Sequence, residues 1–440
     1  MEREGKAPGK RQKEAVKERK GIRMKVTSSY GVEILRLHRP LKQTMEVYRR
    51  AVGYLVPVFE GEWDELSMVP GGKKRFNEAE RLVHTTKKNT ARYPFDERFP
   101  KMPSYLRRSA IMQALGDVSS YHTRYRQWEE AGRGKGKPIL RAAAHCMPVF
   151  YRDNMYRRKE GRTFLKLYSG KDWVWYEVRL RRTDLSYIRK NWGGKKASAP
   201  VLEKRHKKYF LRFSFEESVV LRDKPAGERT VCAVDLGLNT DAVCSIMKAD
   251  GTVAARRFIA SRAEKDRLAR VLNRIRGKQR EHGPGSVAGL WKYACRINEE
   301  IARKAAGGIV SFAADHGADV IVFEYLEIKG RIHGKNRQRL HLWKKDRIRE
   351  ICTHKAHRMG MRVSRVCAWN TSALAYDGSG KVTRDKEDYS MCTFPNGKRY
   401  HCDLSASYNI GARYLIRELL KPLPTSRSEE RFSRNAETDI

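Results

Sequence analysis

Three acidic residues, each next to a run of apolar or small residues, constrain this chain more than any other feature. The run Val231–Asp235 consists of small or branched residues and ends in an acid, a pattern typical of a strand buried on both faces. Ile321–Glu324 ends in the same way, and Asp403 opens a segment rich in small residues, Cys402–Ala412, that favours a helix. A carboxylate is costly to bury without a partner, so a cation is the expected partner.

The three acids are too far apart in the sequence to belong to one loop. Only a folded sheet could bring them together. Three carboxylates gathered at strand and helix ends are suitable ligands for two divalent ions in phosphodiester hydrolysis. The residues alone leave open the alternative that these are acids at ordinary strand ends with no shared role.

The charge of the chain indicates a polyanionic partner. Lys and Arg total 93 against 51 Asp and Glu, which gives a formal net charge of +42 over 440 residues. Self-repulsion at this charge destabilises a compact chain unless a polyanion neutralises it, so we expect a nucleic-acid partner. A ribosomal-type basic protein is the alternative, but such proteins are usually shorter and lack buried acids.

The apolar residues and cysteines indicate an intracellular protein. No apolar run reaches about 18 residues and no apolar signal segment opens the chain, so we expect a cytoplasmic protein with no membrane partner. Its length suffices for two or more domains. Several of the eight cysteines, such as Cys232 and Cys244, lie inside apolar runs, which favours reduced thiols in a core.

In the first half, hydrophobic periodicity predicts strands interrupted by helices. After a disordered basic arm (1–20), alternation from Ile22 predicts the first strand region (21–40). Helical patterns at Leu41–Tyr54 and Pro103–Trp128 predict a helical module over 41–138. Period-two alternation, as in Val174–Arg181, predicts further strands over 139–222. We therefore expect a small OB-like β-barrel with the helical module inserted after its first strand.

The second half predicts an α/β unit over 223–370. Its segments, in order, are the hairpin Ala242–Met247 and Val253–Ile259, a helix around Leu268–Ile275, a helix over Leu290–His316 broken or kinked near Gly307–Gly308, and a helix over Trp343–Met359. A segment with a tight turn at Asn396–Gly397 then fills 371–402. A helical segment (403–420) and a polar tail (421–440) complete the chain.

The three acidic segments resemble the split RuvC nuclease of TnpB, the transposon-encoded RNA-guided endonuclease, and of the compact type V CRISPR effectors. Asp235, Glu324 and Asp403 match the acids of the first, second and third motifs. Thr371–Ser372 and Pro103–Arg108 extend the similarity, which spans about residues 20–415.

The resemblance implies a fold and a reaction. The fold is an α+β multidomain protein: a wedge β-barrel with an inserted helical recognition lobe, followed by an RNase H-like RuvC α/β nuclease domain with a helical insertion. The reaction is metal-dependent DNA cleavage with two Mg²⁺ or Mn²⁺ ions, in which Asp235 bridges both ions and Glu324 and Asp403 each complete one. Glu327 and Asp241, displaced from the matched acids, are poorer candidates.

The resemblance also implies nucleic-acid partners. Guide RNA would supply sequence specificity, while the protein reads a short motif in target double-stranded DNA and holds single-stranded DNA. Arg384 is our candidate for neutralising the scissile phosphate, and a solvated loop arginine is the alternative. The candidate nucleic-acid-binding residues are Tyr105, Arg107, Arg108, Tyr121, Arg124, Arg126, Trp175, Arg179, Arg181, Lys335 and Arg337. Strand aromatics can equally fill a core.

Two rival functions stay open at this point. One is a guided DNA-binding protein that no longer cuts, against which three intact acids argue. The other is a RuvC-like resolvase or transposition factor without guide RNA, which would not need a large basic amino-terminal half. The sequence also leaves open whether the guide comes from a transposon end or a CRISPR array, which flanking motif is read, how the DNA is cut, and whether the protein is a monomer or a homodimer.

The segment 371–402 departs from the resemblance. Typical relatives carry two Cys-x-x-Cys pairs that bind zinc before the third acid. Here Ala373–Gly378 contains no cysteine, and the second region keeps only Cys392 and Cys402. Cys367 with these two and a histidine could still form a site, but the spacing is unlike that of a zinc knuckle. We therefore expect a target-loading loop without zinc.

Overall fold

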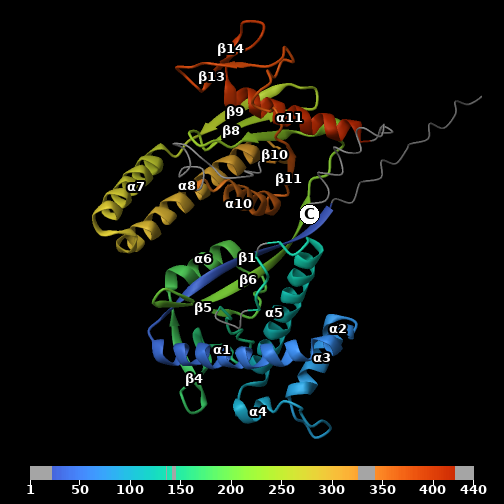
Figure 1. The fold of residues 1–440 in the computed structure, drawn as a ribbon, viewed down its shortest axis with the longest axis vertical. Coiled ribbons are helices and arrows are strands. Elements are labelled where there is room, and N and C mark those ends of the chain that lie inside the picture. The colour runs from blue at the N-terminus through green and yellow to red at the C-terminus, as the bar shows by residue number, and fades with distance from the viewer. Residues whose placement is uncertain (1–21, 135, 141–144, 326–341, 422–440) are drawn as a thin grey trace, which may run out of the picture. The chain divides into compact units, whose positions relative to one another are not determined.

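The computed structural model describes residues 22–134, 136–140, 145–325 and 342–421. They form two compact units, one of residues 27–217 and one of the described residues from 218 onward together with 22–26 (Figure 1). The predicted basic arm, the loop containing Lys335 and Arg337, and nearly all of the predicted tail lie outside the described residues.

An antiparallel sheet is the centre of the unit 27–217. Its strands are β1 (Ile22–Leu35), β2 (Tyr156–Lys159), β3 (Arg162–Tyr168), β4 (Trp173–Leu180), β5 (Val201–Arg205) and β6 (Lys208–Leu221), in the order β2-β3-β4-β1-β6-β5. The amide of Phe150 donates to the Pro200 carbonyl (2.8 Å) and that of Leu202 to the Pro148 carbonyl (2.9 Å). The segment that leads toward β2 at one edge is thus bonded to β5 at the other edge, an arrangement compatible with the expected barrel.

Helices are inserted between β1 and β2, as the sequence predicted. They are α1 (His38–Gly61), α2 (Trp63–Met68), α3 (Gly72–Val83), α4 (Phe95–Arg98) and α5 (Ser104–Glu130). Tyr48 of α1 is hydrogen-bonded to Ser109 of α5 (3.0 Å), and the Thr44 hydroxyl accepts the Tyr168 amide of β3 (2.9 Å). Helices and sheet share one cluster of buried hydrophobic side chains.

One helix of this unit was not predicted. Helix α6 (Arg182–Trp192) interrupts the region assigned to strands, and Trp192 is its only buried residue among those described. Its Asp184 accepts the backbone amide of Glu33 in β1 (3.0 Å), which ties the helix to the sheet. Such a weakly apolar helix depends on a tertiary contact that periodicity does not reveal.

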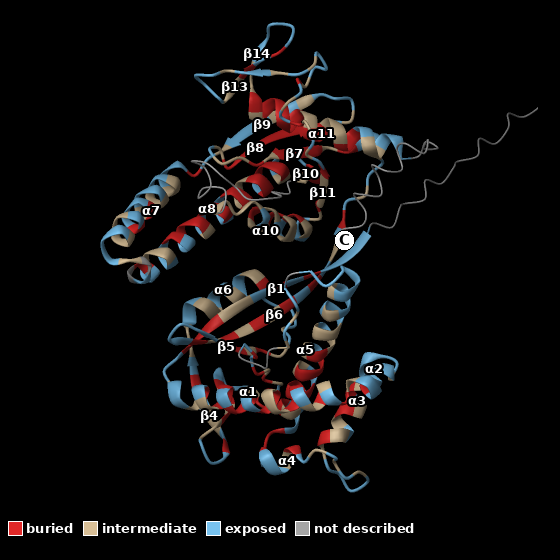
Figure 2. Cartoon of the chain, in the orientation of Figure 1, coloured by how far each residue is buried: buried red, intermediate tan, exposed pale blue. Residues whose placement is uncertain are grey.

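The second unit contains a mixed sheet with the order β11-β10-β7-β8-β9. Its strands are β7 (Val231–Asp235), β8 (Ala242–Met247), β9 (Val253–Ile259), β10 (Val320–Tyr325) and β11 (Arg362–Cys367). Strand β10 is parallel to β7 and β11, whereas β8 is antiparallel to β7 and β9, so the predicted hairpin is confirmed. Figure 2 shows the buried interior of this sheet, in which β8 is buried along its whole length.

Helices cover both faces of this sheet. They are α7 (Arg262–His282), α8 (Ala288–Asp315), α10 (Lys345–Arg358) and α11 (Cys402–Leu420), with short 3₁₀ turns at Ala226–Glu228 and Pro284–Val287. Cys232 and Val234 pack with α8 and α10, whereas Val231 and Ala233 pack with α11. This alternation of contacts is the period of two expected of a strand buried on both faces.

Two glycines allow the helices to approach the sheet closely. Helix α8 runs without interruption through Gly307 and Gly308, so the predicted break is wrong. A Cβ atom at Gly308 would lie 3.1 Å from the Ile259 side chain of β9. Likewise, a Cβ atom at Gly411 of α11 would lie 3.2 Å from the Ala233 Cβ atom and even closer to the Met247 sulfur.

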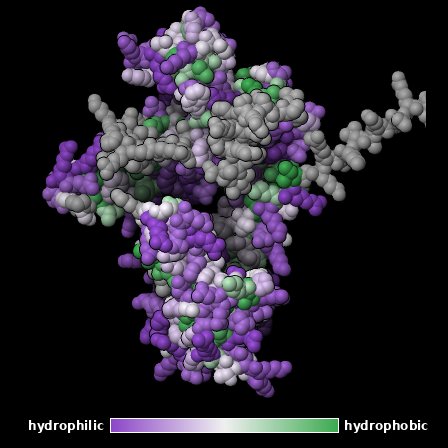
Figure 3. Space-filling model, turned by 45° about the vertical axis from the view of Figure 1, so that its right-hand side comes forward, coloured by the Kyte–Doolittle hydropathy of each residue, from purple (hydrophilic) through white to green (hydrophobic). Residues whose placement is uncertain are grey.

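A small sheet precedes α11. It consists of β12 (Thr383–Arg384), β13 (Met391–Thr393) and β14 (Arg399–His401). The predicted turn at Asn396–Gly397 is present: Gly397 has a φ of +83° and its amide donates to the Phe394 carbonyl (2.9 Å). Hydrophilic residues cover most of the face seen in Figure 3. None of the helices in the described ranges is both long and apolar enough to cross a membrane.

Candidate functional site

Two of the three predicted acids meet at one edge of the mixed sheet. Asp235 ends β7, and Glu324 lies near the end of the parallel neighbour β10. Val234 is in register with Phe323, so the two acids that follow are opposite one another. The two carboxyl groups are close enough to interact: Glu324 raises the pKa of Asp235, and Asp235 lowers that of Glu324. The sheet therefore brings Asp235 and Glu324 together, as the sequence predicted.

Burial dominates the electrostatics of this pair. Desolvation raises the pKa of Asp235 well above its ordinary value, and the nearby charges of Glu324 and Asp403 raise it further. Desolvation also raises the pKa of Glu324, while the Thr371 hydroxyl opposes this increase. Two half-buried carboxyl groups this close are costly to ionise together, so the arrangement favours a bound proton or a cation between them.

Asp403 is the third acid on this side of the sheet. It lies in the first turn of α11, the helix that packs on β7 and β8, and its charge acts on Asp235. Among the residues that the structure describes, no three His, Cys, Asp or Glu side chains form a group that could hold a metal ion. The available donors are nevertheless carboxylate oxygens, which are the ligands that Mg²⁺ and Mn²⁺ prefer.

A hydrogen-bond chain positions Glu324 from helix α11. The buried Thr371 hydroxyl donates to Glu324 Oε2 (2.9 Å). The Asn409 side-chain amide in turn donates to the carbonyls of Thr371 (2.9 Å) and Leu374 (2.8 Å). Thr371 was noted only as part of the resemblance, and Asn409 was not predicted as a site residue. The available signal was a polar residue shortly after the segment that forms β11.

Arg384 and Asp241 have different surroundings. Arg384 is exposed on β12, and its positive charge lowers the pKa of Asp235, so it lies within electrostatic range of the acid pair. The Asp241 carboxylate forms an ion pair with Lys265 (2.6 Å) and accepts the Ser261 amide (2.6 Å). Asp241 is therefore engaged at the start of α7, and Glu327 lies outside the described residues.

The cysteines of the predicted loop are in two environments. Cys392 and Cys402 are buried in a small apolar cluster with Ala375 and Phe394, whereas Cys367 is exposed. The Cys392 thiol donates to the Tyr400 carbonyl (3.4 Å), and burial raises the pKa of Cys402 to about 12. Zinc binds thiolates, which such burial disfavours. The expectation of no zinc stays a prediction.

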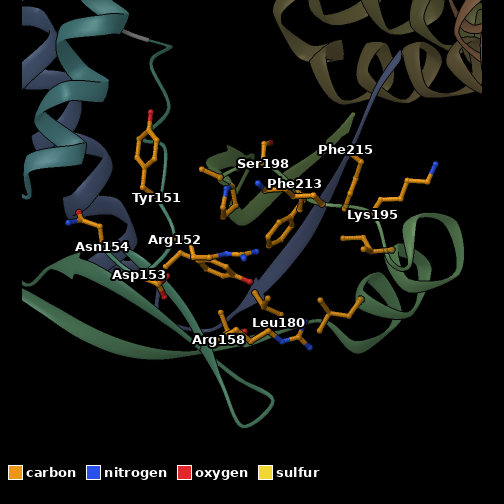
Figure 4. Close-up of a pocket in the computed structure, with 18 of the residues that line it drawn as sticks. Tyr151, Arg152, Asp153, Asn154, Arg158, Leu180, Lys195, Ser198, Phe213 and Phe215 are labelled. Carbon is orange, nitrogen blue, oxygen red and sulfur yellow. The ribbon is translucent and has the colours of Figure 1, made fainter. Parts of the chain in front are cut away.

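The unit 27–217 contains a second candidate site, a cavity of about 1370 Å³ (Figure 4). Its lining combines cationic and aromatic side chains: Arg152, Arg158, Lys195, Lys196, Tyr105, Tyr151, Tyr156, Phe213 and Phe215. Figure 4 shows Arg152 and Phe213 projecting into it from different segments. Asp153 is the only acid of this lining. The cavity thus suits a ligand that carries both negative charge and flat apolar rings.

The predicted nucleic-acid-binding residues differ in their availability. Tyr105 lines the cavity, where its ring lies 5.2 Å from that of Tyr151. Arg107 is largely buried and pairs with Asp96 (3.2 Å), and Arg181 pairs with Glu33. Arg108 is paired with Glu80 (3.5 Å), and Tyr121 is half-buried against Tyr125. The ring of Trp175 is covered by the Arg157 guanidinium, 4.2 Å from its centroid. The remaining predicted residues in the described ranges are exposed: Arg124, Arg126 and Arg179.

The four cations of the cavity were not among the predicted nucleic-acid-binding residues. Arg152 and Arg158 belong to a basic stretch before β3, and Lys195 and Lys196 follow the glycines after α6. The signal was present as local clusters of Arg and Lys. Only the fold shows that the two clusters line the same cavity.

Comparison with known proteins identifies similar folds. A sequence model of the Aq_aa04 family matches residues 28–169. No curated protein matches the chain. The protein in the cryo-EM structure of a Cas12f1–sgRNA–target DNA complex is 15% identical, with a TM-score of 0.51 over 84% of this chain and 81% of that one.

Two further solved structures are similar at lower scores. The mini-RNA-guided endonuclease CRISPR-Cas_phi3 is 11% identical, with a TM-score of 0.49 over 92% of this chain and 93% of that one. C2c1 of Alicyclobacillus acidoterrestris, solved with single-guide RNA, is 12% identical, with a TM-score of 0.42 over 86% and 69% of the two chains. These three structures are of type V CRISPR effectors, and the chain shares the fold of Cas12f1.

Proposed function

We propose that this protein is an RNA-guided DNA endonuclease whose RuvC-type site contains Asp235, Glu324 and Asp403. The observation that carries the proposal is the pairing of two half-buried carboxyl groups, Asp235 and Glu324, which are opposite one another in the register of β7 and β10. A fold retains such an unfavourable pair when a cation or a reaction needs it. The sheet order β11-β10-β7-β8-β9 agrees with the RNase H-like fold expected of a RuvC nuclease.

The three acids would hold the divalent ions. Bound Mg²⁺ or Mn²⁺ supplies an activated water and stabilises the leaving oxygen in phosphodiester hydrolysis. Because desolvation and the neighbouring carboxylates raise the pKa of Asp235, a bound cation would compete with protons for this pair. Thr371 orients the Glu324 carboxylate through its hydroxyl. Arg384, which carries its charge near the pair, neutralises the scissile phosphate.

The cavity of the unit 27–217 supports the guide-RNA part of the proposal. Arg152, Arg158 and Lys196 would contact RNA phosphates, whereas Lys195 pairs with Glu217. The ring faces of Tyr105, Tyr151 and Phe213 would stack on unpaired bases. The protein of the similar Cas12f1 structure was solved with sgRNA and target DNA. This chain would bind the same two partners, guide RNA and target DNA.

The deciding experiment begins with the nucleic acid that copurifies with the protein. We expect a discrete structured RNA, and its sequence should identify the guide and its origin. The complex should then cut DNA complementary to the guide in Mg²⁺. Guided binding without cutting would support the non-cleaving rival, whereas cleavage that survives removal of the RNA would support a guide-independent resolvase.

The role of the cavity can be tested separately. We expect Arg152, Arg158, Lys195 and Lys196, replaced together by Ala, to weaken RNA binding and to flatten its salt dependence by up to about 0.7 per lost phosphate contact in log–log units. The matched control replaces Lys73, Lys74, Lys87 and Lys88, four exposed lysines of the same unit. Equal affinities and salt slopes for the two quadruple variants would contradict the assignment.

A further inference from the structure

Trp369 is an exposed aromatic residue with no role in the core. It is 73% exposed, and no other tryptophan in the described ranges is classed as exposed. A large ring left in water forgoes the free energy that burial would provide. The exposed ring face of Trp369 is therefore available to a binding partner.

The backbone places Trp369 beside the acid pair. Strand β11 runs parallel to β10, with Val366 opposite Glu324, so β11 ends at the same sheet edge. Trp369 follows β11 and precedes Thr371, whose hydroxyl donates to Glu324. Two residues of chain span at most about 7 Å, so the Trp369 Cα atom lies close to the support of Glu324.

The segment that carries Trp369 is anchored. The Thr371 amide donates to the Ala368 carbonyl (3.3 Å), which closes a turn around Trp369 and Asn370. Asn370 has a φ of +59°, a left-handed conformation that Asn tolerates better than most residues. Asn409 of α11 binds the Thr371 carbonyl. Hydrogen bonds from Thr371 and Asn409 therefore fix the backbone that carries the Trp369 ring.

Cationic side chains also lie near this turn, in addition to the acid pair. Arg413 donates to the Cys367 carbonyl (2.8 Å), and both Arg413 and Lys345 act electrostatically to lower the pKa of Glu324. The Arg365 guanidinium lies over the ring of Tyr325, 5.1 Å from its centroid. An exposed ring with positive charges around it suits a nucleic-acid strand better than an apolar protein surface.

We propose that Trp369 stacks on an unpaired base of the DNA strand in the nuclease site, beside the phosphate to be cleaved. This inference rests on the proposed nuclease function. Stacking needs an exposed base face, which a single strand offers and a base-paired duplex does not. Trp369 is thus a positioning residue that favours single-stranded substrate and tolerates any base.

The experiment measures the energetic coupling between the ring and a base. The probe is a single-stranded oligodeoxythymidylate, either intact or with one abasic nucleotide at successive positions. Binding is measured in an Asp235→Asn background, which prevents cutting. We expect Trp369→Ala to weaken binding of the intact strand about 5- to 150-fold, and Trp369→Phe to retain most of the affinity.

The abasic series distinguishes stacking from a general loss of binding. With Trp369 present, one abasic position should weaken binding by a similar factor, and this penalty should vanish in Trp369→Ala. The matched control is Met68→Ala, which removes a side chain 84% exposed on α2 and should leave every value unchanged. In cleavage assays, Trp369→Ala should raise KM for single-stranded DNA more than it lowers kcat.

A photochemical readout does not depend on cleavage. A strand with one 5-iododeoxyuridine at the sensitive position should crosslink to the peptide containing Trp369. If the wild-type protein cuts DNA but Trp369→Ala leaves the abasic penalty and the crosslinked peptide unchanged, the stacking inference is overturned while the nuclease proposal stands. If the protein does not cut DNA, the nuclease proposal fails, and the crosslink still decides whether Trp369 contacts a base.

Discussion

The two ends of the mixed sheet carry acids whose partners have opposite charges, Asp319 being buried and Asp235 half-buried. Asp319, just before β10, is 2% exposed, and its Oδ2 atom accepts from Lys224 (3.0 Å) and from the Thr230 amide (2.9 Å). Asp235, at the other end of the neighbouring strand β7, lies opposite the acid Glu324, which raises its pKa. Both acids border the same apolar sheet. Asp319 is paired with a cation, Lys224, whereas Asp235 lies beside another carboxyl group, that of Glu324.

This difference separates a structural acid from a candidate catalytic one. A buried carboxylate with a cation and an amide donor stabilises the fold, because removing either partner leaves an unsatisfied group. A buried pair of carboxyls opposes folding unless it holds a proton or a metal ion. Burial alone therefore does not mark a functional acid, whereas the chemical nature of its neighbour does.

The largest expected effect is the loss of cleavage when one of the three acids of the proposed nuclease site is removed. Asp235→Ala, Glu324→Ala or Asp403→Ala should each lower the cleavage rate by about 10³-fold or more, because ion-assisted charge stabilisation supplies several kcal/mol. Guided binding should persist, and Asp319→Asn should cut at a near-normal rate at a temperature where it is folded. Cleavage rates in Mg²⁺ and target binding provide the measurement. Full cutting by any one of the three alanine variants would remove that residue from the site.

The second effect is an opposite change of stability at the two ends. The folded-state pKa of Asp235 is raised above its ordinary 3.8, so the folded protein binds the extra proton. This contribution is fully present below the ordinary pKa and is lost as pH rises through the raised pKa. In metal-free buffer near pH 7.5, Asp235→Asn should therefore raise Tm, whereas Asp319→Asn should lower it, each by about 2–4 °C per kcal/mol.

Thermal unfolding across pH and Mg²⁺ concentration tests this contrast. Asp235→Asn should flatten the fall of Tm with rising pH. Mg²⁺ should raise the Tm of the wild type but not that of Asp235→Asn, because only an intact site stabilises the folded state by binding. A decrease of Tm in both variants, of equal size, would show that the two acids have the same structural role.

A smaller effect is expected from the hydroxyl that positions Glu324. Thr371→Val keeps the shape of the side chain but removes the donor, so the cleavage rate should fall about 10-fold for a loss of roughly 1–1.5 kcal/mol. Thr371→Ser, which retains the hydroxyl, is the matched control and should retain most of the rate. Equal kcat values for the Val and Ser variants would mean that the 2.9 Å hydrogen bond does not orient Glu324.

The smallest effect should come from the small sheet before α11. If the segment is metal-free, elemental analysis should find well under one zinc per chain, and Cys392→Ser should keep most of the cleavage activity. The raised pKa of the neighbouring Cys402 favours a protonated thiol there. A stoichiometric zinc that resists mild chelation would contradict this prediction and would show that the thiols of this segment bind a metal ion.

Local periodicity explains which predictions were accurate. The strand Val231–Asp235 and the hairpin Ala242–Ile259 are confirmed, because a strand buried in a sheet needs apolar residues wherever its side chains meet a core. The helix over Ser104–Glu130 also matches its prediction closely. The predicted break at Gly307–Gly308 is wrong, because α8 is continuous there and Gly308 allows close packing against Ile259.

The sequence by itself determined the strands, the acids at their ends and the basic character of the chain, because these follow from residue type and short-range order. Only the tertiary structure decided that Asp235 faces Glu324 while Asp319 faces Lys224, since partners far apart in sequence are chosen by strand register and helix packing. The same holds for the support of Glu324 by Thr371 and Asn409. Asp235 and Asp319 are the same residue type, and they differ in pKa and role because folding places different neighbours beside them.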